Sequence, residues 1–135
     1  SEDSGRHDYV HVRFNGDSGA NYTVQHFGAG SDTVSSGYGL NQTSIRFMYV
    51  PAATATANYF GTFKFWLPQY TSTTFYKMIM GSSAFENNSA SDWDFLMYMG
   101  TGAWANTAAV TQVTLTTDTD FAEFSELTLY GITGT

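Results

Sequence analysis

The sequence predicts an all-β fold, an antiparallel two-sheet β-sandwich that is jelly-roll-like and has about eight strands. Apolar and polar residues alternate with a period of two in short runs, and Gly, Asn, Asp and Ser separate these runs. Aromatic residues make up 17% of the chain and charged residues only 13%, a composition that favours strands over exposed helices. The chain has 135 residues and no evident internal repeat, so we expect a single β-sandwich domain over residues 1–135.

The first two strands are expected over residues 7–14 and 20–27. In the first of these runs Val10 and Val12 lie on one face and polar residues on the other. Residues 15–19 contain Asn-Gly and a second glycine, which adopt positive φ at little cost. The sequence therefore predicts that the two runs form a hairpin.

The middle of the chain is expected to contain one clear strand. Residues 28–32 break the second run, and glycines interrupt the stretch up to Leu40. Residues 43–50 alternate strongly, and Pro51 ends them because proline has no N–H for a ladder hydrogen bond. Small residues over 52–57 predict a loop, with a single helical turn as the alternative.

The remaining strands follow at regular spacing. Residues 59–67 form a densely aromatic run, and residues 73–80 alternate after a short turn. Residues 81–92 are polar and predict a loop, after which residues 93–99 form a further strand ended by a Gly-Thr-Gly turn.

Two strands are expected to close the chain, over residues 110–117 and 126–132. Residues 118–124 bridge them. Leu127 and Leu129 alternate with polar and aromatic residues, so one face of the last strand can pair across the ladder with the strand before it.

Charge and residue content exclude several functions. The net charge is −7, and the few basic residues are scattered, so no basic stripe is available for nucleic acid. No apolar run approaches the roughly 20 residues that span a bilayer, so we expect no membrane insertion. The chain has no cysteine and no recognised catalytic motif, so we expect no enzyme, no catalytic residue and no cofactor.

Histidines form one candidate metal site. His7 and His11 share a face of the first strand, and His26 faces them if the hairpin forms. Their spacing matches no known zinc motif, so the sequence favours cross-strand histidines without metal.

Carboxylates form other candidates. The pairs Asp92/Asp94 and Asp118/Asp120 could each chelate calcium, although turn chemistry and solubility explain the second pair more simply. Glu86 with the first pair flanks a tryptophan, which is compatible with a glycan-degrading enzyme only if the fold sets two carboxylates opposite each other.

Aromatic residues carry the main functional prediction. Tryptophan and tyrosine combine a flat apolar ring with a polar tip, which suits stacking on sugars or packing against proteins. Exposed candidates, unless they fill the core, are Trp66, Trp93, Trp104, Tyr38, Tyr59, Tyr70 and Tyr98. The candidate glycan-binding or partner surface combines two of the tryptophans with polar residues near them in sequence: Trp93, Trp104, Asn87, Asn88, Asp92 and Asn106.

The C-terminal segment resembles the ending of many virion proteins of tailed phages, some of them cyanophage or marine. There, a strand, a loop with phenylalanine and a last strand ending in "LYGI" follow each other, as residues 113–116, 120–121 and 125–132 do here. Earlier pieces match the same group in the same order, at residues 19–25, 42–46, 75–77 and 106–110. Residues 117–124 depart from the pattern, because they are more acidic than the usual Gly/Asn-rich loop.

This resemblance implies a non-enzymatic structural or surface protein of a virion, a tail, fibre or capsid-decorating component. It implies a location at the virion surface or outside the cell, and partners that are further copies of the chain, as a homotrimer or lattice, and other virion proteins. The alternative is a lectin-like module that recognises cell-surface glycans. A glycan-degrading enzyme is the third reading.

Overall fold

The computed structural model of the chain describes residues 7–30, 32–53, 55, 58–86 and 95–132. Eight strands form there: β1 (His7–Phe14), β2 (Tyr22–Gly30), β3 (Thr33–Gln42), β4 (Ile45–Pro51), β5 (Thr62–Trp66), β6 (Lys77–Glu86), β7 (Phe95–Trp104) and β8 (Val113–Thr116). None of the described segments forms a helix of the length and hydropathy needed to cross a bilayer.

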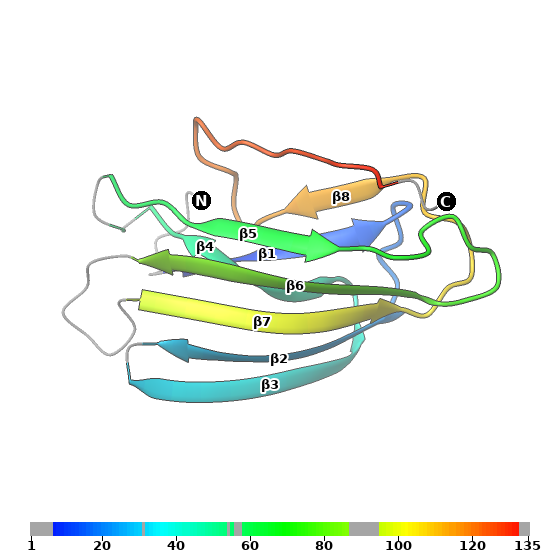
Figure 1. Cartoon of the computed structure of the whole chain (residues 1–135), viewed down its shortest axis with the longest axis horizontal. Coiled ribbons are helices and arrows are strands. Elements are labelled where there is room, and N and C mark those ends of the chain that lie inside the picture. The colour runs from blue at the N-terminus through cyan, green and yellow to red at the C-terminus, as the bar shows by residue number, and fades with distance from the viewer. Residues whose placement is uncertain (1–6, 31, 54, 56–57, 87–94, 133–135) are drawn as a thin grey trace.

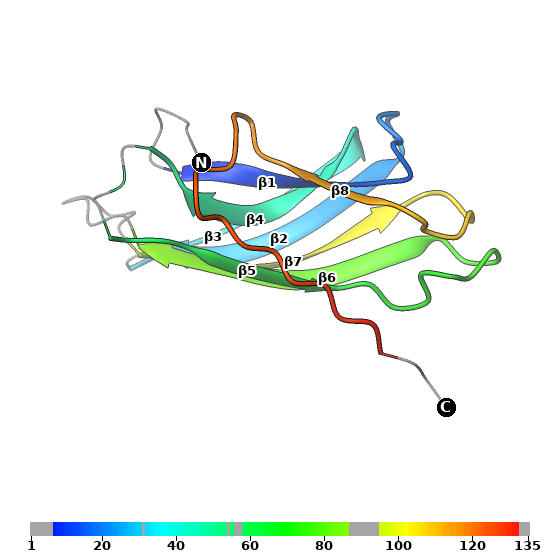
Figure 2. The ribbon, with the colours of Figure 1, turned by 90° about the horizontal axis from the view of Figure 1, so that it is seen from above.

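The strands form two sheets, one facing the other (Figures 1 and 2). A three-stranded sheet has the order β4-β1-β8 and is called the narrow sheet below, and a five-stranded sheet has the order β3-β2-β7-β6-β5 and is called the wide sheet. All pairings are antiparallel. The predicted all-β, antiparallel two-sheet sandwich is therefore confirmed.

The predicted hairpin between the first two strands is wrong. β1 pairs with β4 and β8 in the narrow sheet, whereas β2 pairs with β3 and β7 in the wide sheet. Residues 15–21 therefore cross from one sheet to the other. The Tyr22 hydroxyl holds this crossing, because it donates to the carbonyl oxygen of Asp17 (3.0 Å) and accepts from the N–H of Phe14 (3.1 Å).

The carboxylate of Asp17 ties the same crossing to the core. It accepts hydrogen bonds from Trp104 Nε1 (2.7 Å), Asn21 Nδ2 (2.9 Å) and the N–H of Gly19 (2.8 Å). The bond from Trp104, followed by those from Asn21 and Gly19, holds the pKa of Asp17 below its ordinary value.

Several strands differ from their predicted extents, and β2 continues to Gly30, into the expected break at residues 28–32. The glycine-interrupted stretch before Leu40 forms β3, a full edge strand of ten residues. Its glycines are required by packing: a Cβ on Gly37 would lie 2.8 Å from Nε2 of His26, its partner across the ladder. β6 continues to Glu86 and β7 to Trp104, because these two strands pair along their whole length.

The predicted last strand over residues 126–132 is wrong. No residue from 117 to 132 belongs to a strand, and residues 118–132 are all exposed. This segment passes the side of the sandwich where β5 and β8 lie and then leaves the body (Figure 2). Residues 125–132 are called the terminal arm below.

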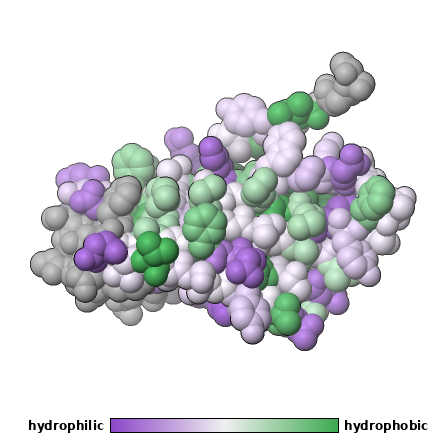
Figure 3. Space-filling view, turned by 60° about the horizontal axis from the view of Figure 1, so that its bottom comes forward, coloured by the Kyte–Doolittle hydropathy of each residue, from purple (hydrophilic) through white to green (hydrophobic). Residues whose placement is uncertain are grey.

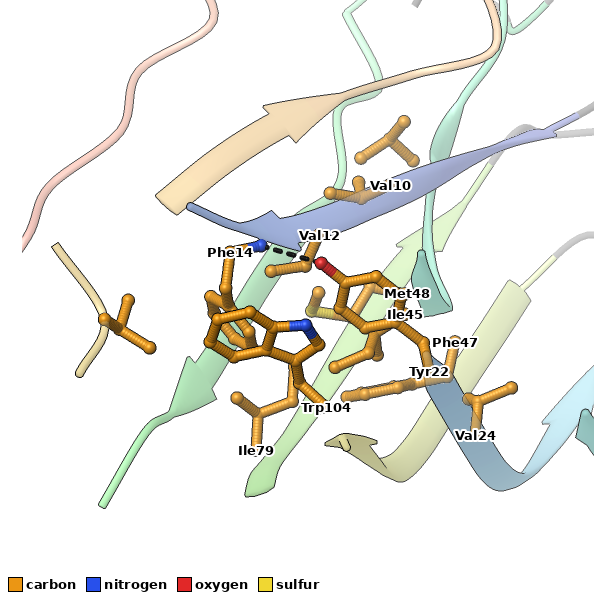
Figure 4. Packing of buried hydrophobic residues seen from close by; sticks show 12 residues of the cluster. Val10, Val12, Phe14, Tyr22, Val24, Ile45, Phe47, Met48, Ile79 and Trp104 are labelled. Carbon is orange, nitrogen blue, oxygen red and sulfur yellow. Dashed lines mark hydrogen bonds between the residues drawn. The ribbon is translucent and has the colours of Figure 1, made fainter. Parts of the chain in front are cut away.

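The core lies between the sheets, and the predicted alternation in β1 is confirmed there. Val10, Val12 and Phe14 are all fully buried. The ring of Trp104 lies 5.7 Å from that of Phe14 (centroid to centroid) and stacks on Tyr22 at 6.4 Å (Figure 4).

Close approach of the sheets depends on glycine at one position in β7. A Cβ on Gly102 would collide with the side chain of Ile45 in β4. Glycine therefore allows β4 to settle directly on the inner face of the wide sheet.

Asp8 fixes the chain where it leaves β8. Its side chain is buried, and its carboxylate accepts from the N–H of Asp118 (3.2 Å) and from Oγ1 of Thr119 (3.3 Å). Because β1 and β8 are antiparallel, with His11 opposite Thr116, these bonds continue the β1–β8 contact past the end of the ladder.

Candidate functional site: the outer face of the wide sheet

The side of the wide sheet that points away from the core is mainly apolar. Successive side chains in a strand alternate between the two faces, so the residues between the buried ones share this side. It is called the outer face and consists of Val34, Ser36, Tyr38 and Leu40 of β3, Thr23, Gln25, Phe27 and Ala29 of β2, Met97, Met99, Thr101 and Ala103 of β7, Met78, Met80, Ser82 and Ala84 of β6, and Thr62, Lys64 and Trp66 of β5.

The pairing register brings the large side chains of the outer face together. Met99 lies opposite Phe27 on one side and Ser82 on the other, and Met80 lies opposite Trp66. Met80 is 64% exposed and Trp66 is 51% exposed. Figure 3 shows apolar side chains spread among weakly polar and strongly hydrophilic ones over the visible part of the surface.

Charge is nearly absent from this surface. Within the residues that define the outer face, Lys64 alone is charged, although the whole chain carries a net charge of −7. Large apolar patches are uncommon on the exposed surface of monomeric proteins, which makes the outer face a candidate contact surface.

Two shallow hollows lie on the outer face. One has a volume of about 210 Å³ and is lined by Thr23, Val24, Gln25, Tyr38, Leu40, Met78, Thr101, Gly102 and Ala103. The other has a volume of about 370 Å³ and is lined by Lys64, Phe65, Trp66, Met80, Gly81, Ser82 and Met99. The second hollow places one flat indole beside an ammonium group and a hydroxyl.

The predicted glycan or partner residues do not come together in the described structure. Asn87, Asn88, Asp92 and Trp93 lie outside the described residues. Trp104 is 1% exposed, because its ring fills the core and its Nε1 donates to Asp17, so the expectation that it forms part of a surface site is wrong.

Asn106 has a local structural role. It is partly exposed, and its Oδ1 accepts a hydrogen bond from the N–H of Ala108 (2.9 Å), which shapes the loop after β7.

The other aromatic candidates divide between surface and core. Trp66, Tyr38, Tyr59 and Tyr70 are exposed, and the first two lie on the outer face. Tyr98 is buried, in a cluster with Tyr49. Their ring centroids are 4.4 Å apart, and burial, followed by the neighbouring tyrosines, raises the pKa of Tyr49.

Sequence reasoning missed the methionines. Met78 and Met80 are two residues apart in one run, as are Met97 and Met99 in another, so alternation alone places each pair on one face. The alternation could not predict that β6 pairs with β7, and this pairing places the two methionine pairs side by side.

The histidines do not form the zinc arrangement considered above. His26 lies in the wide sheet, not across a hairpin from His11. Both ring nitrogens of His11 are engaged, Nδ1 with Oγ of Ser44 and Nε2 with Oδ1 of Asp118, each at 2.8 Å. In the part of the chain that the structure describes, no group of three His, Cys, Asp or Glu side chains is arranged to hold a metal ion.

His26 has a different environment. Burial, and then the positive charge of Arg46, lowers the pKa of its ring. The ring therefore favours the neutral form near neutral pH, packed against Tyr98 at 5.8 Å between centroids.

Comparisons with known proteins add no further assignment. No protein-family model, curated protein or solved structure matches this chain.

Proposed function

We propose that this chain is a non-enzymatic structural or surface component of a tailed-phage particle, in a tail, a fibre or a capsid decoration. It assembles by burying the outer face against further copies of itself, as a homotrimer or lattice, and against other virion proteins. The observation that carries the assembly part of the proposal is the apolar, almost uncharged outer face.

Composition of the outer face supports a protein partner. Cores of protein interfaces are poor in charge and rich in aromatic residues and methionine. The outer face has four methionines and three aromatic rings, those of Phe27, Tyr38 and Trp66, with a single charge. Methionine side chains are flexible and polarisable, so they adapt to the shape of a partner.

The C-terminal segment and the earlier motifs resemble those of tailed-phage proteins, which supports the proposal that the chain is part of a phage particle. Low charge and abundant Thr, Ser and Tyr also suit a domain that is built into an assembly.

Assembly through the outer face is tested by sedimentation velocity over a range of micromolar concentrations. Wild-type protein is expected to form oligomers, and the double variant Met80→Asp/Met99→Asp is expected to shift them toward smaller species by adding charge to the centre of the face. The matched control is Phe60→Asp, which changes an 87% exposed apolar residue outside the strands. Equal oligomers in the face variant and the control would reject the outer face as the interface.

The particle itself is tested by imaging the assembly that contains this chain. An ordered array of the chain at the particle surface, with the outer face turned toward neighbours, is expected. Finding the chain only as free protein in the same material would contradict the proposal.

A lectin-like role is the second candidate, favoured by the hollow at Trp66. Sugar rings stack on exposed indoles, and Lys64 and Ser82 supply hydrogen-bonding groups at its rim. A glycan array with wild type and Trp66→Ala tests it, with Tyr59→Ala as a control at an exposed aromatic outside the hollow. Glycan binding that is lost only in the Trp66 variant supports this role, and no binding by wild type rejects it.

A further inference from the structure

The terminal arm has the sequence of a strand but no partner. Leu127 and Leu129 share one face and Thr128, Tyr130 and Ile132 the other, the period-two alternation of a strand. The two leucines are 67% and 87% exposed. A lone strand is not stable in water, so exposure of this segment predicts that it pairs elsewhere.

The narrow sheet has a free edge at β8, with unpaired backbone groups and partly exposed apolar side chains. Among the described residues β8 pairs only with β1, which leaves its other side without ladder hydrogen bonds. Leu115 lies opposite Val12 and packs on the core only in part. An added strand beside β8 would therefore meet both unpaired backbone groups and incompletely covered apolar surface.

The facing edge of the wide sheet is incompletely covered as well. Phe63 and Phe65 of β5, with Leu67 just after it, are half-buried and border the core. β5 and β8 lie on the same side of the sandwich (Figures 1 and 2). Figure 1 draws β8 at the margin of the sandwich next to β5, so a strand added beside β8 extends the narrow sheet on this open side.

A strained residue lies at the base of the arm. Phe124 has φ of 69°, a left-handed conformation that disfavours bulky side chains by roughly 1–2 kcal/mol. A turn holds it there, because the N–H and the hydroxyl of Ser125 both donate to the carbonyl oxygen of Ala122 (3.2 and 2.8 Å). Strained connections of this kind favour exchange of the segment that follows them.

We propose that the terminal arm of one chain adds as a strand to the free edge of β8 in a second copy of the chain, and that the two copies exchange arms reciprocally. Leu127 and Leu129 then continue the inward-facing row of Val113 and Leu115 on the open side of the sandwich where β5 and β8 lie. The partner's strand satisfies the β8 edge through main-chain hydrogen bonds, as in other cases of strand addition.

The second copy, rather than the same chain, is the occupant for two reasons. In the single chain the arm passes the β8 and β5 edges without pairing and leaves the body (Figure 2), and it stands off the surface in Figure 3. A reciprocal exchange also closes with two-fold symmetry, so it stops at the dimer.

The dimer is tested by light scattering coupled to gel filtration at about 10–100 µM protein. With Met80→Asp/Met99→Asp present to remove association through the outer face, the full-length chain is expected to be a dimer, and the same variant truncated after Phe124 is expected to be a monomer with unchanged circular dichroism. A monomeric full-length chain would overturn the proposal, and so would a dimer that persists after truncation.

Point variants keep the test decisive if the truncated chain does not fold. Leu127→Asp/Leu129→Asp places two charges on the face that would turn inward, and Thr128→Asp/Tyr130→Asp places two on the opposite face. The first variant is expected to raise the dimer dissociation constant at least tenfold more than the second. Equal effects would overturn the proposed orientation of the arm and with it the proposal.

Cross-linking separates exchange between chains from pairing within one chain. The chain has no cysteine, so Thr114→Cys and Thr128→Cys can be introduced singly and mixed with a short bis-maleimide. Exchange predicts a cross-linked pair of the two single variants. A cross-link that forms only within the double variant shows that each arm pairs with its own β8 and overturns the exchange.

The terminal arm and the outer face are separate surfaces, so an experiment can reject the arm exchange without rejecting association through the outer face, and the reverse. Met80→Asp/Met99→Asp is expected to leave the arm-exchanged dimer intact while it removes larger oligomers. Loss of the dimer in that variant would assign the dimer to the outer face and overturn the exchange.

Discussion

Single residues connect parts of this molecule that are distant in sequence. Asp17, in the crossing between the sheets, accepts the indole N–H of Trp104, which is otherwise enclosed by apolar side chains. Gly102 leaves the space that Ile45 fills. Each contact joins the two sheets at one point, so each can be removed by a single substitution.

Asp17→Ala is expected to destabilise the fold by about 1–3 kcal/mol at neutral pH, because the buried indole N–H of Trp104 loses its acceptor. Since the pKa of Asp17 is lowered in the folded protein, its stabilisation is present above its unfolded-state value of 3.8 and is lost as the pH falls through the lower folded value. Urea unfolding at pH 6.5 and near pH 2 measures this. A difference between wild type and variant that does not shrink at the lower pH would contradict the assignment.

Gly102→Ala is expected to cost about 1–3 kcal/mol or more, because the new methyl group overlaps the side chain of Ile45. Gly131→Ala is the control, since a Cβ there meets nothing within 4 Å. Thermal unfolding of both variants checks this, and equal melting temperatures would show that β4 moves away without cost.

Elements are joined mainly by loops that cross between the sheets. Asn15 is one such junction: its Oδ1 accepts from the N–H groups of Thr111 (2.9 Å) and Gln112 (3.1 Å), and its Nδ2 donates to the carbonyl oxygen of Ala109 (2.8 Å). The end of β1 thereby positions the segment that leads into β8.

Asn15→Ala is expected to loosen the start of β8 and to cost about 1–2 kcal/mol through the lost side-chain bonds. Hydrogen exchange followed by mass spectrometry is expected to show faster exchange in residues 111–116 than in β6 and β7. Uniformly faster exchange over the whole chain would contradict a local role.

Sequence patterns predicted strands better than their partners. The alternation of β1 follows directly from burial of one face, so this strand was found. β3 was missed because its glycines, of which Gly37 lies against His26, look like a break in a strand. The arm was given a partner in its own chain because alternation says which face is apolar and not which edge it meets.

The whole molecule combines a net charge of −7 with an almost uncharged outer face. Repulsion between copies therefore comes from the rest of the surface, while the attraction proposed here comes from the outer face. Salt screens the repulsion between copies, since the screening length falls to roughly 3 Å at 1 M, but it does not weaken the apolar attraction.

Association through the outer face is therefore expected to strengthen as sodium chloride rises from about 0.05 M to 1 M. Sedimentation velocity at fixed protein concentration measures this, with Met80→Asp/Met99→Asp as the variant that should respond little. Oligomers that dissociate as salt rises would indicate an interface made of ion pairs instead.

Composition predicted that some aromatic rings are exposed but not which ones. The exposure of each ring depends on the register of its strand. Trp66 and Tyr38 face outward, whereas Trp104 faces inward because its strand continues past the expected turn at residues 100–102.

The bonds from Asp8 to Asp118 and Thr119 have a mechanical consequence if the chain is pulled from both ends. The start of β1 and the end of β8 lie at the same end of their antiparallel ladder. A pull on both termini would therefore load that end of the ladder and break its hydrogen bonds one after another. The buried carboxylate of Asp8 stands at the point where that opening starts. The Asp8 bonds would then be loaded before the first β1–β8 pair, His11 with Thr116, and together with the β1–β4 pairs at His7 and Asp8.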